Sequence, residues 1–268
     1  MFRIENTGNL LSGKTDTADS TDSSKTGLSA NEEAVLRSGL TGETEKSDVI
    51  KGLGIEKHSE PAAAAEQDQS AKEVKKLKDM WSPVAKGVSD KFYEEIVAIA
   101  KRVNCDPVYL SIVLYQESKF NPRAKNGSFR GIGQMSHVTL ADSLQNVKRK
   151  NLDIEVNTSM SLNRFAQLSR EKQLPYIEAY IMNAKRIAGM SANEKIESGK
   201  LYALFFLPGY ADKPVLASKF NPKTAKYYRS NRPFDMNNDG KITPAELKKF
   251  LDDRADVWGI TLPDDKTS

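Results

Sequence analysis

Apolar residues recur at helical spacing through most of the chain after residue 80. Phe92, Ile96 and Ile99 fall near i, i+4 and i+7, which predicts an amphipathic helix over 89–104. Ser89 stands just before this run, where serine is a favourable N-cap. The chain contains no run of 18 or more apolar residues. The pattern therefore predicts a mainly α protein with no membrane span.

A second helix is predicted directly afterwards, where Asp106 and Pro107 form an N-cap followed by proline at the first helical position. The apolar run 109–115 follows, and Glu117 stands at its end. We expect this carboxylate to be buried on most sides. Burial disfavours the charged form and raises the pKa of a carboxyl group, as a general acid working near neutral pH requires.

Glycine and proline then interrupt the helical pattern between residues 121 and 134, which predicts a loop or short irregular strands. Gly131 and Gly133 would let the backbone pass close to a ligand or to another strand. The remaining helical patterns cover 29–37, 62–80, 139–147 and 151–200.

The first 78 residues differ from the rest in composition. They are rich in Ser, Thr, Gly, Lys and Glu, and the stretch 15–26 is of low complexity. Such a segment cannot bury enough apolar surface to order itself, so we predict a disordered N-terminal segment. It has no apolar core of a Sec signal peptide. A plain tether, an address for type III or flagellar export, and delivery on a virion remain alternatives.

Positive charge is concentrated in the middle of the chain. The whole sequence has a net charge of +4, but residues 81–230 hold 23 Lys and Arg against 13 Asp and Glu. A basic domain fits an anionic polymer such as cell-wall glycan, nucleic acid or anionic lipid. No nucleic-acid-binding motif accompanies the charge, so we expect no nucleic-acid partner. Cys105, the single cysteine, is predicted to be a small core residue.

Residues 235–246 fit the twelve-position EF-hand loop. Asp235 opens the loop, Gly240 allows the sharp turn at the sixth position, and Glu246 can bind calcium through both carboxylate oxygens at the twelfth. Because no second EF-hand is visible, we expect a structural Ca2+ that pins the helix 244–257 against the rest of the chain. A capped acidic turn that binds nothing is the alternative. The predicted ligands are Asp235, Asn237, Asp239, Lys241 through its carbonyl, Thr243 and Glu246.

Three spaced groups of residues together resemble a known family. They are Glu117-Ser118, then Phe120-Asn121-Pro122-x-Ala124, then Gly131-x-Gly133-Gln134-Met135. This pattern is similar to that of the soluble lytic transglycosylases, which have a lysozyme-like α+β fold and cleave peptidoglycan, some with a lone EF-hand.

The resemblance implies roles for individual residues. It makes Glu117 the catalytic acid and base, and Ser118 a group that orients the substrate acetamido group or Glu117 itself. Gln134 would contact the sugar, although its amide could instead only brace the loop. Many such enzymes carry Ala-Tyr-Asn-Ala-Gly where this chain has Phe205-Phe206-Leu207-Pro208-Gly209, so the usual Asn contact is missing. The implied substrate-binding residues are Ser118, Gln134, Met135, Tyr210 and Tyr228.

The acidic residues favour a mechanism with one carboxylate. None lies between Ser118 and Ala141, and the next acids, Asp142, Asp153 and Glu155, are not placed by their spacing opposite Glu117. Glycoside hydrolases normally use two carboxylates. A transglycosylase that forms a 1,6-anhydro ring therefore fits better than a goose-type lysozyme with water as acceptor. A secreted or virion protein that only binds the cell wall is the third alternative.

These inferences divide the chain into three parts. Residues 1–78 form the N-terminal segment, 79–230 the lysozyme-like domain and 231–268 the EF-hand segment. The expected partners are peptidoglycan strands, together with components of a secretion apparatus or a virion. The expected location is the periplasm or the cell wall, reached without a Sec signal.

Overall fold

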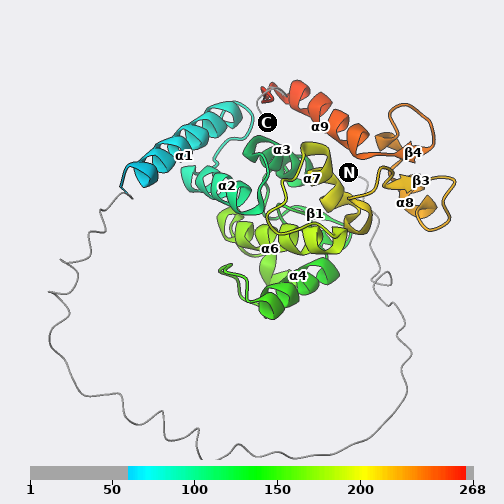
Figure 1. Cartoon of the computed structure of the whole chain (residues 1–268), viewed down its shortest axis with the longest axis horizontal. Helices are drawn as coiled ribbons and strands as arrows, with labels where there is room; N and C mark the ends of the chain where they lie inside the picture. The colour runs from blue at the N-terminus through cyan, green and yellow to red at the C-terminus, as the bar shows by residue number, and fades with distance from the viewer. Residues whose placement is uncertain (1–59, 264–268) are drawn as a thin grey trace, which may run out of the picture. The chain divides into compact units, whose positions relative to one another are not determined.

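The computed structural model of the chain describes residues 60–263, and side chains from residue 65. Residues 67–263 belong to one compact unit, which is mainly helical (Figure 1). The predicted helix over 29–37, the low-complexity stretch 15–26 and most of the predicted N-terminal segment lie outside the described residues. The pattern over 62–80 is confirmed as a helix, α1 (Glu60–Trp81). Within the described range, no helix is both long and apolar enough to cross a membrane.

Helices α2 (Asp90–Val103) and α3 (Pro107–Ser118) form the predicted pair and pack against each other. Ser89 caps α2 by accepting from the backbone N–H of Phe92. Asp106 caps α3 in the same way, with Pro107 at its first position. Both N-terminal signals read from the sequence are confirmed, since a side-chain oxygen satisfies N–H groups that the helix leaves without partners.

The segment after α3 contains a small hairpin, β1 (Lys125–Asn126) with β2 (Phe129–Arg130), paired antiparallel so that Lys125 lies opposite Arg130. Helix α4 (His137–Lys150) follows and begins with a capping box between Ser136 and Thr139. The predicted loop with short strands over 121–134 is thus confirmed, as is the helix over 139–147.

The predicted continuous helical stretch over 151–200 is wrong in its extent. The structure has a single turn, α5 (Leu162–Phe165), then α6 (Arg170–Ala188) and the start of α7 (Ser198–Phe206). Gly189 takes a left-handed φ of 80° and ends α6, since glycine adopts this conformation without steric cost. Apolar periodicity alone could not show these interruptions.

The C-terminal part is built from short elements and one long helix. A single turn, η1 (Pro208–Tyr210), leads to β3 (Ala217–Ser218), α8 (Ala225–Ser230) and a second turn, η2 (Arg232–Phe234). Strand β4 (Lys241–Ile242) pairs antiparallel with β3. Helix α9 (Pro244–Trp258) begins with a capping box between Thr243 and Glu246.

Helix α9 packs against α7 and α3 (Figure 1). Its inner face carries Leu247, Leu251 and Ala255, all fully buried in the same core as α2, α3 and α6. The predicted boundary between residues 230 and 231 therefore falls inside the compact unit, in a place where apolar packing is continuous. The hydrophobic core thus holds the helix that the sequence predicted to be pinned by calcium.

Candidate functional site

Glu117 lies in the last turn of α3, only 5% exposed, and lines a cavity of about 640 Å3. Of the described residues that line this cavity, Glu117 alone carries a carboxylate. Asp142, Asp153 and Glu155 are not among them. The lining residues are Gln116, Glu117, Ser118, Lys119, Asn121, Ala124, Lys125, Asn126, Gln134 and Arg254.

The backbone turns sharply directly after Glu117 and Ser118. Lys119 and Phe120 both have left-handed φ angles, of 58° and 57°, which cost non-glycine residues energy. Phe120 is fully buried, and its ring lies 5.0 Å from the rings of Trp81, Phe92 and Tyr115, centroid to centroid. This aromatic cluster holds the chain in the costly conformation and so fixes where the end of α3 points.

Ser118 lies beside Glu117 on the cavity wall. Its hydroxyl donates to the carbonyl of Leu114, one turn earlier in α3, at 3.0 Å. The hydroxyl proton is thereby directed into the helix, while the oxygen keeps acceptor capacity. Ser118 is thus set to accept a hydrogen bond from a bound group. Its predicted part in orienting an acetamido group remains a prediction.

The structure gives Gln134 a bracing position. Its side-chain amide donates to the carbonyls of Gly131 at 2.9 Å and Ala124 at 3.3 Å, and the residue is 2% exposed. Gln134 also lines the cavity, so its predicted sugar contact stays a prediction. Met135, also predicted to bind substrate, is 1% exposed, lies in the hydrophobic core and does not line the cavity; its backbone pairs with Arg130.

The two glycines of the motif pass close to α6, not to another strand. A Cβ on Gly131 would lie 2.4 Å from Oε1 of Gln173, and one on Gly133 would lie 2.4 Å from Cδ1 of Ile177. Gln173 is fully buried. Its Oε1 accepts from the N–H of Ile132 at 2.9 Å, and its Nε2 donates to the carbonyl of Pro122 at 2.9 Å. Gln173 thereby ties both ends of the motif loop to α6.

Lys119 and Arg254 bring positive charge to the cavity, which Lys125 also lines. Lys119 Nζ lies 3.9 Å from the centroid of the Trp258 ring and 4.4 Å from that of Tyr115. Burial of this amine, and then the charge of Arg254, lowers the pKa of Lys119 from 10.5 to about 8. Arg254 and Trp258 both lie on α9. Through Arg254, the C-terminal helix supplies part of the lining of the Glu117 cavity.

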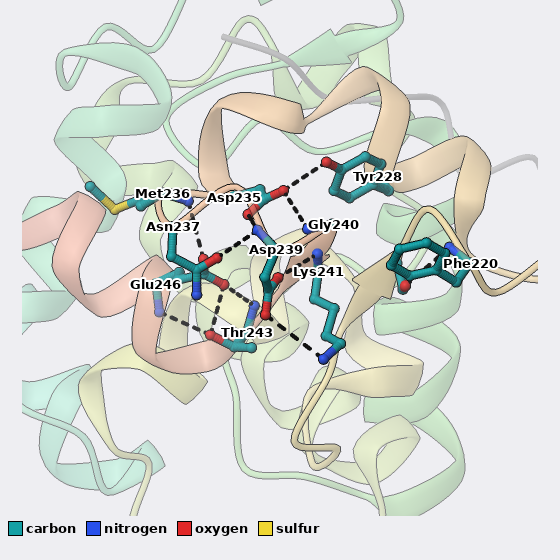
Figure 2. A network of polar contacts seen from close by, with 11 residues as sticks. Phe220, Tyr228, Asp235, Met236, Asn237, Asp239, Gly240, Lys241, Thr243 and Glu246 are labelled. Atoms are coloured by element: carbon teal, nitrogen blue, oxygen red, sulfur yellow. Dashed lines mark hydrogen bonds and ion pairs between the residues drawn. The ribbon is translucent and has the colours of Figure 1, made fainter.

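The calcium-type loop lies at the start of α9, and Figure 2 shows its polar contacts. The N–H of Asp239 is shared by Oδ1 of Asp235, at 3.1 Å, and Oδ1 of Asn237, at 2.9 Å. Two predicted ligand oxygens therefore lie close together on one side of the loop. Asp239 Oδ1 accepts from the N–H of Lys241 at 2.8 Å, and Gly240 has the left-handed φ of 86° that the sixth position requires.

The carboxylate of Glu246 closes the loop. One oxygen accepts from the N–H of Met236 at 3.1 Å, and the other accepts from the N–H and hydroxyl of Thr243 at 3.0 and 2.9 Å (Figure 2). Among residues 60–263, no three His, Cys, Asp or Glu side chains converge as a metal group. A cation here would instead use carboxylate, amide, hydroxyl and carbonyl oxygens together, a donor set that suits Ca2+.

The structure places Tyr228 at this loop and not at the cavity. Its hydroxyl donates to Oδ2 of Asp235 at 2.7 Å. Burial alone would raise the pKa of Asp235, but the hydrogen bonds from Tyr228, Gly240 and its neighbours outweigh burial and lower it. Tyr210 lies on η1, which packs on α6, and it does not line the Glu117 cavity either.

Sequence reasoning missed three residues that shape the cavity: Lys119, Gln173 and Arg254. Lys119 lies between Ser118 and Phe120 of the motif, so its position in the sequence already pointed to the site. Gln173 and Arg254 are 56 and 137 positions beyond Glu117, on helices whose polar faces look ordinary in sequence. Only the packing of α6 and α9 brings them to the site.

Comparison of the chain with protein-family models, with curated proteins and with solved structures finds no match in any of the three. The resemblance to lytic transglycosylases therefore rests on the spaced motif alone.

Proposed function

We propose that this protein is a peptidoglycan lytic transglycosylase of lysozyme-like fold, with Glu117 as its single general acid and base. The observation that carries the proposal is the cavity in which Glu117 is the sole carboxylate among the described lining residues. A buried acid next to polar amides from Asn121, Asn126 and Gln134 fits a glycan, whose hydroxyl and acetamido groups both donate and accept hydrogen bonds.

Glu117 acts twice in the proposed reaction, first as an acid and then as a base. Protonated Glu117 donates to the glycosidic oxygen between N-acetylmuramic acid and N-acetylglucosamine, and the C1–O bond breaks with its electron pair going to that oxygen. The substrate acetamido oxygen stabilises the cation at C1. The C6 hydroxyl oxygen then attacks C1 and closes the 1,6-anhydro ring, while the Glu117 carboxylate accepts the hydroxyl proton. Water is not consumed, and Glu117 ends as it began.

The residues around Glu117 have positioning roles in this scheme. The Phe120 cluster fixes the end of α3, and Gln173 fixes the loop that carries Gln134. Ser118 accepts from the acetamido N–H. We place the reaction in the periplasm or cell wall, on peptidoglycan strands, with delivery by a secretion apparatus or a virion.

Calcium belongs to the same proposal. Asp235, Asn237, Asp239, Thr243, Glu246 and the carbonyl of Lys241 would hold the ion. Bound there, Ca2+ would stabilise the loop and the start of α9 by joining Asp235 to Glu246, 11 positions later in the chain.

The test is mass spectrometry of fragments released from purified peptidoglycan by the wild type and by Glu117→Gln. Anhydro-muropeptides from the wild type alone would support the proposal, with Asp142→Asn as a matched control that keeps activity. Reducing ends would make the protein a hydrolytic lysozyme. The absence of fragments with calcium present would favour a cell-wall-binding protein without activity.

A further inference from the structure

Positive charge dominates the lining of the cavity that holds Glu117. Lys119, Lys125 and Arg254 all line it. None of the three forms an ion pair with another described residue, whereas many exposed lysines of this chain do so, as Lys249 does with Asp253 at 3.0 Å. The excess positive charge is therefore left for something other than the protein to neutralise.

Lys119 is held at the cavity by the structure around it. It caps α3, and its backbone N–H donates to the carbonyl of Tyr115 at 2.7 Å. Its ammonium lies over the faces of Tyr115 and Trp258, where the negative face of each ring attracts a cation. Lys119 is exposed, but the two rings restrict its side chain, so less rotamer freedom remains to be lost when a ligand binds than for a lysine without such contacts.

Arg254 approaches the same cavity from α9. Its guanidinium carbon lies 5.2 Å from the centroid of the Phe250 ring, one turn earlier in the helix. It is near enough to Lys119 to disfavour a second positive charge there. Two like charges that repel each other beside a general acid are unfavourable in the free protein, and a bound anion would relieve the repulsion.

We infer that Lys119 and Arg254 form a subsite for a carboxylate of the glycan substrate, next to the bond that Glu117 is proposed to protonate. The inference rests on the proposed function, because it states which glycans the same cavity prefers. The guanidinium offers paired N–H donors and the ammonium a point charge, which together suit a carboxylate. A lactyl carboxylate on alternate sugars and a carboxylate of an attached peptide stem share this chemistry, and a plain N-acetylglucosamine chain has neither.

The test is calorimetric binding of three soluble tetrasaccharides to the full chain carrying Glu117→Gln, so that no bond is cleaved during titration. The first is the neutral N-acetylglucosamine tetramer. The second alternates N-acetylglucosamine with N-acetylmuramic acid that has free lactyl carboxylates, and the third is the same alternating sugar with peptide stems attached. We expect the second or third to bind about tenfold tighter than the first. A preference for the third alone assigns the subsite to a stem carboxylate. A preference for the second alone assigns it to the lactyl carboxylate, which is an amide in the third sugar, and a preference for both means that the subsite accepts either carboxylate.

Single substitutions show which residues cause the preference for carboxylate-bearing sugars. Lys119→Met and Arg254→Gln should each remove most of it, whereas Lys119→Arg should retain it. Lys249→Gln is the matched control, since it removes an α9 charge that does not line the cavity, and it should change nothing. Equal binding of neutral and carboxylate-bearing sugars, or a preference that survives the Lys119→Met, Arg254→Gln double substitution, overturns the inference.

Failure of the proposed function is distinguishable from failure of this subsite. If the chain with Glu117 intact cleaves peptide-bearing strands but binds neutral sugars as tightly, the subsite alone is overturned. If the preference is present and no strand is cleaved, the subsite stands and the proposed reaction is overturned.

Discussion

The phenol of Tyr228 donates a 2.7 Å hydrogen bond to Oδ2 of Asp235, and both side chains are buried. The same oxygen accepts from the N–H of Gly240 at 2.9 Å. The hydrogen bond joins α8 to the first residue of the calcium-type loop and fixes which way the Asp235 carboxylate faces. Tyr228 therefore supports the loop from outside it.

Tyr228→Phe should lower the free energy of unfolding by about 2 kcal/mol, because a buried hydrogen bond to a charged group is lost. Urea unfolding of the full chain measures this. Tyr210→Phe is the matched control, since the Tyr210 hydroxyl has no hydrogen bond within the described residues. Equal stability of Tyr228→Phe and the wild type would show that the bond contributes nothing.

Removal of calcium should lower the Tm of the wild type. An ion that binds only the folded chain at a hundred times its Kd stabilises it by about 2.7 kcal/mol. The measurement is a melting curve with and without a calcium chelator. Asp235→Ala should abolish the difference between the two curves, while Asp253→Asn, on the exposed face of α9, should preserve it. A wild-type Tm that is indifferent to chelator would remove calcium from the proposal.

Gly131→Ala should destabilise the chain more than Gly127→Ala. Both glycines have positive φ, of 77° and 56°, so both alanines bear a backbone cost of about 1–2 kcal/mol. Only at Gly131 would the added Cβ also meet Gln173 and Phe165, at 2.4 and 2.6 Å. Chemical denaturation of both variants separates the two contributions. Equal losses would mean that the loop moves away from α6 at little cost.

The lowered pKa of Lys119 predicts a pH dependence of stability. Its value of about 8 in the folded chain is below the ordinary 10.5, so between these values the unfolded chain binds more protons and stability rises with pH. The groups that face the amine are Tyr115, Trp258 and Arg254. Because Lys119 is largely exposed, solvent screening limits the rise to below about 1 kcal/mol.

Urea unfolding of the wild type and Lys119→Met at about pH 7 and pH 9.5 tests this linkage. The wild type should gain stability relative to the variant as pH rises. Lys249→Met, which removes an exposed lysine paired with Asp253, should follow the wild type at both values. Parallel profiles for Lys119→Met and the wild type would contradict the prediction.

Local signals in the sequence predicted local structure well. Ser89 and Asp106 cap the helices that their positions indicated, because capping depends only on neighbouring backbone groups. Glu117 is buried as expected, since an apolar run that covers all sides of a short helix leaves its last turn in the core.

Contacts between distant segments could not be read in this way. The motif glycines suggested close approach, but not that Gln173 and Ile177 of α6 are what they approach. Tyr228 was placed in the active-site wall by resemblance, and the structure puts its hydroxyl on Asp235. Both outcomes depend on how the helices pack. Apolar periodicity shows which face of a helix is buried, but it does not show which other element covers that face.

Helix α9 has a consequence for where this chain can be divided. A protein cut after Ser230 would keep the entire transglycosylase-like motif and look complete in sequence. It would nevertheless lose Arg254 from the cavity lining and Trp258 from beneath the Lys119 amine. It would also expose the apolar surface of α3 and α7 that Leu247 and Leu251 cover. The smallest fragment that keeps the Glu117 cavity intact therefore extends through the C-terminal helix, well beyond the last residue of the motif.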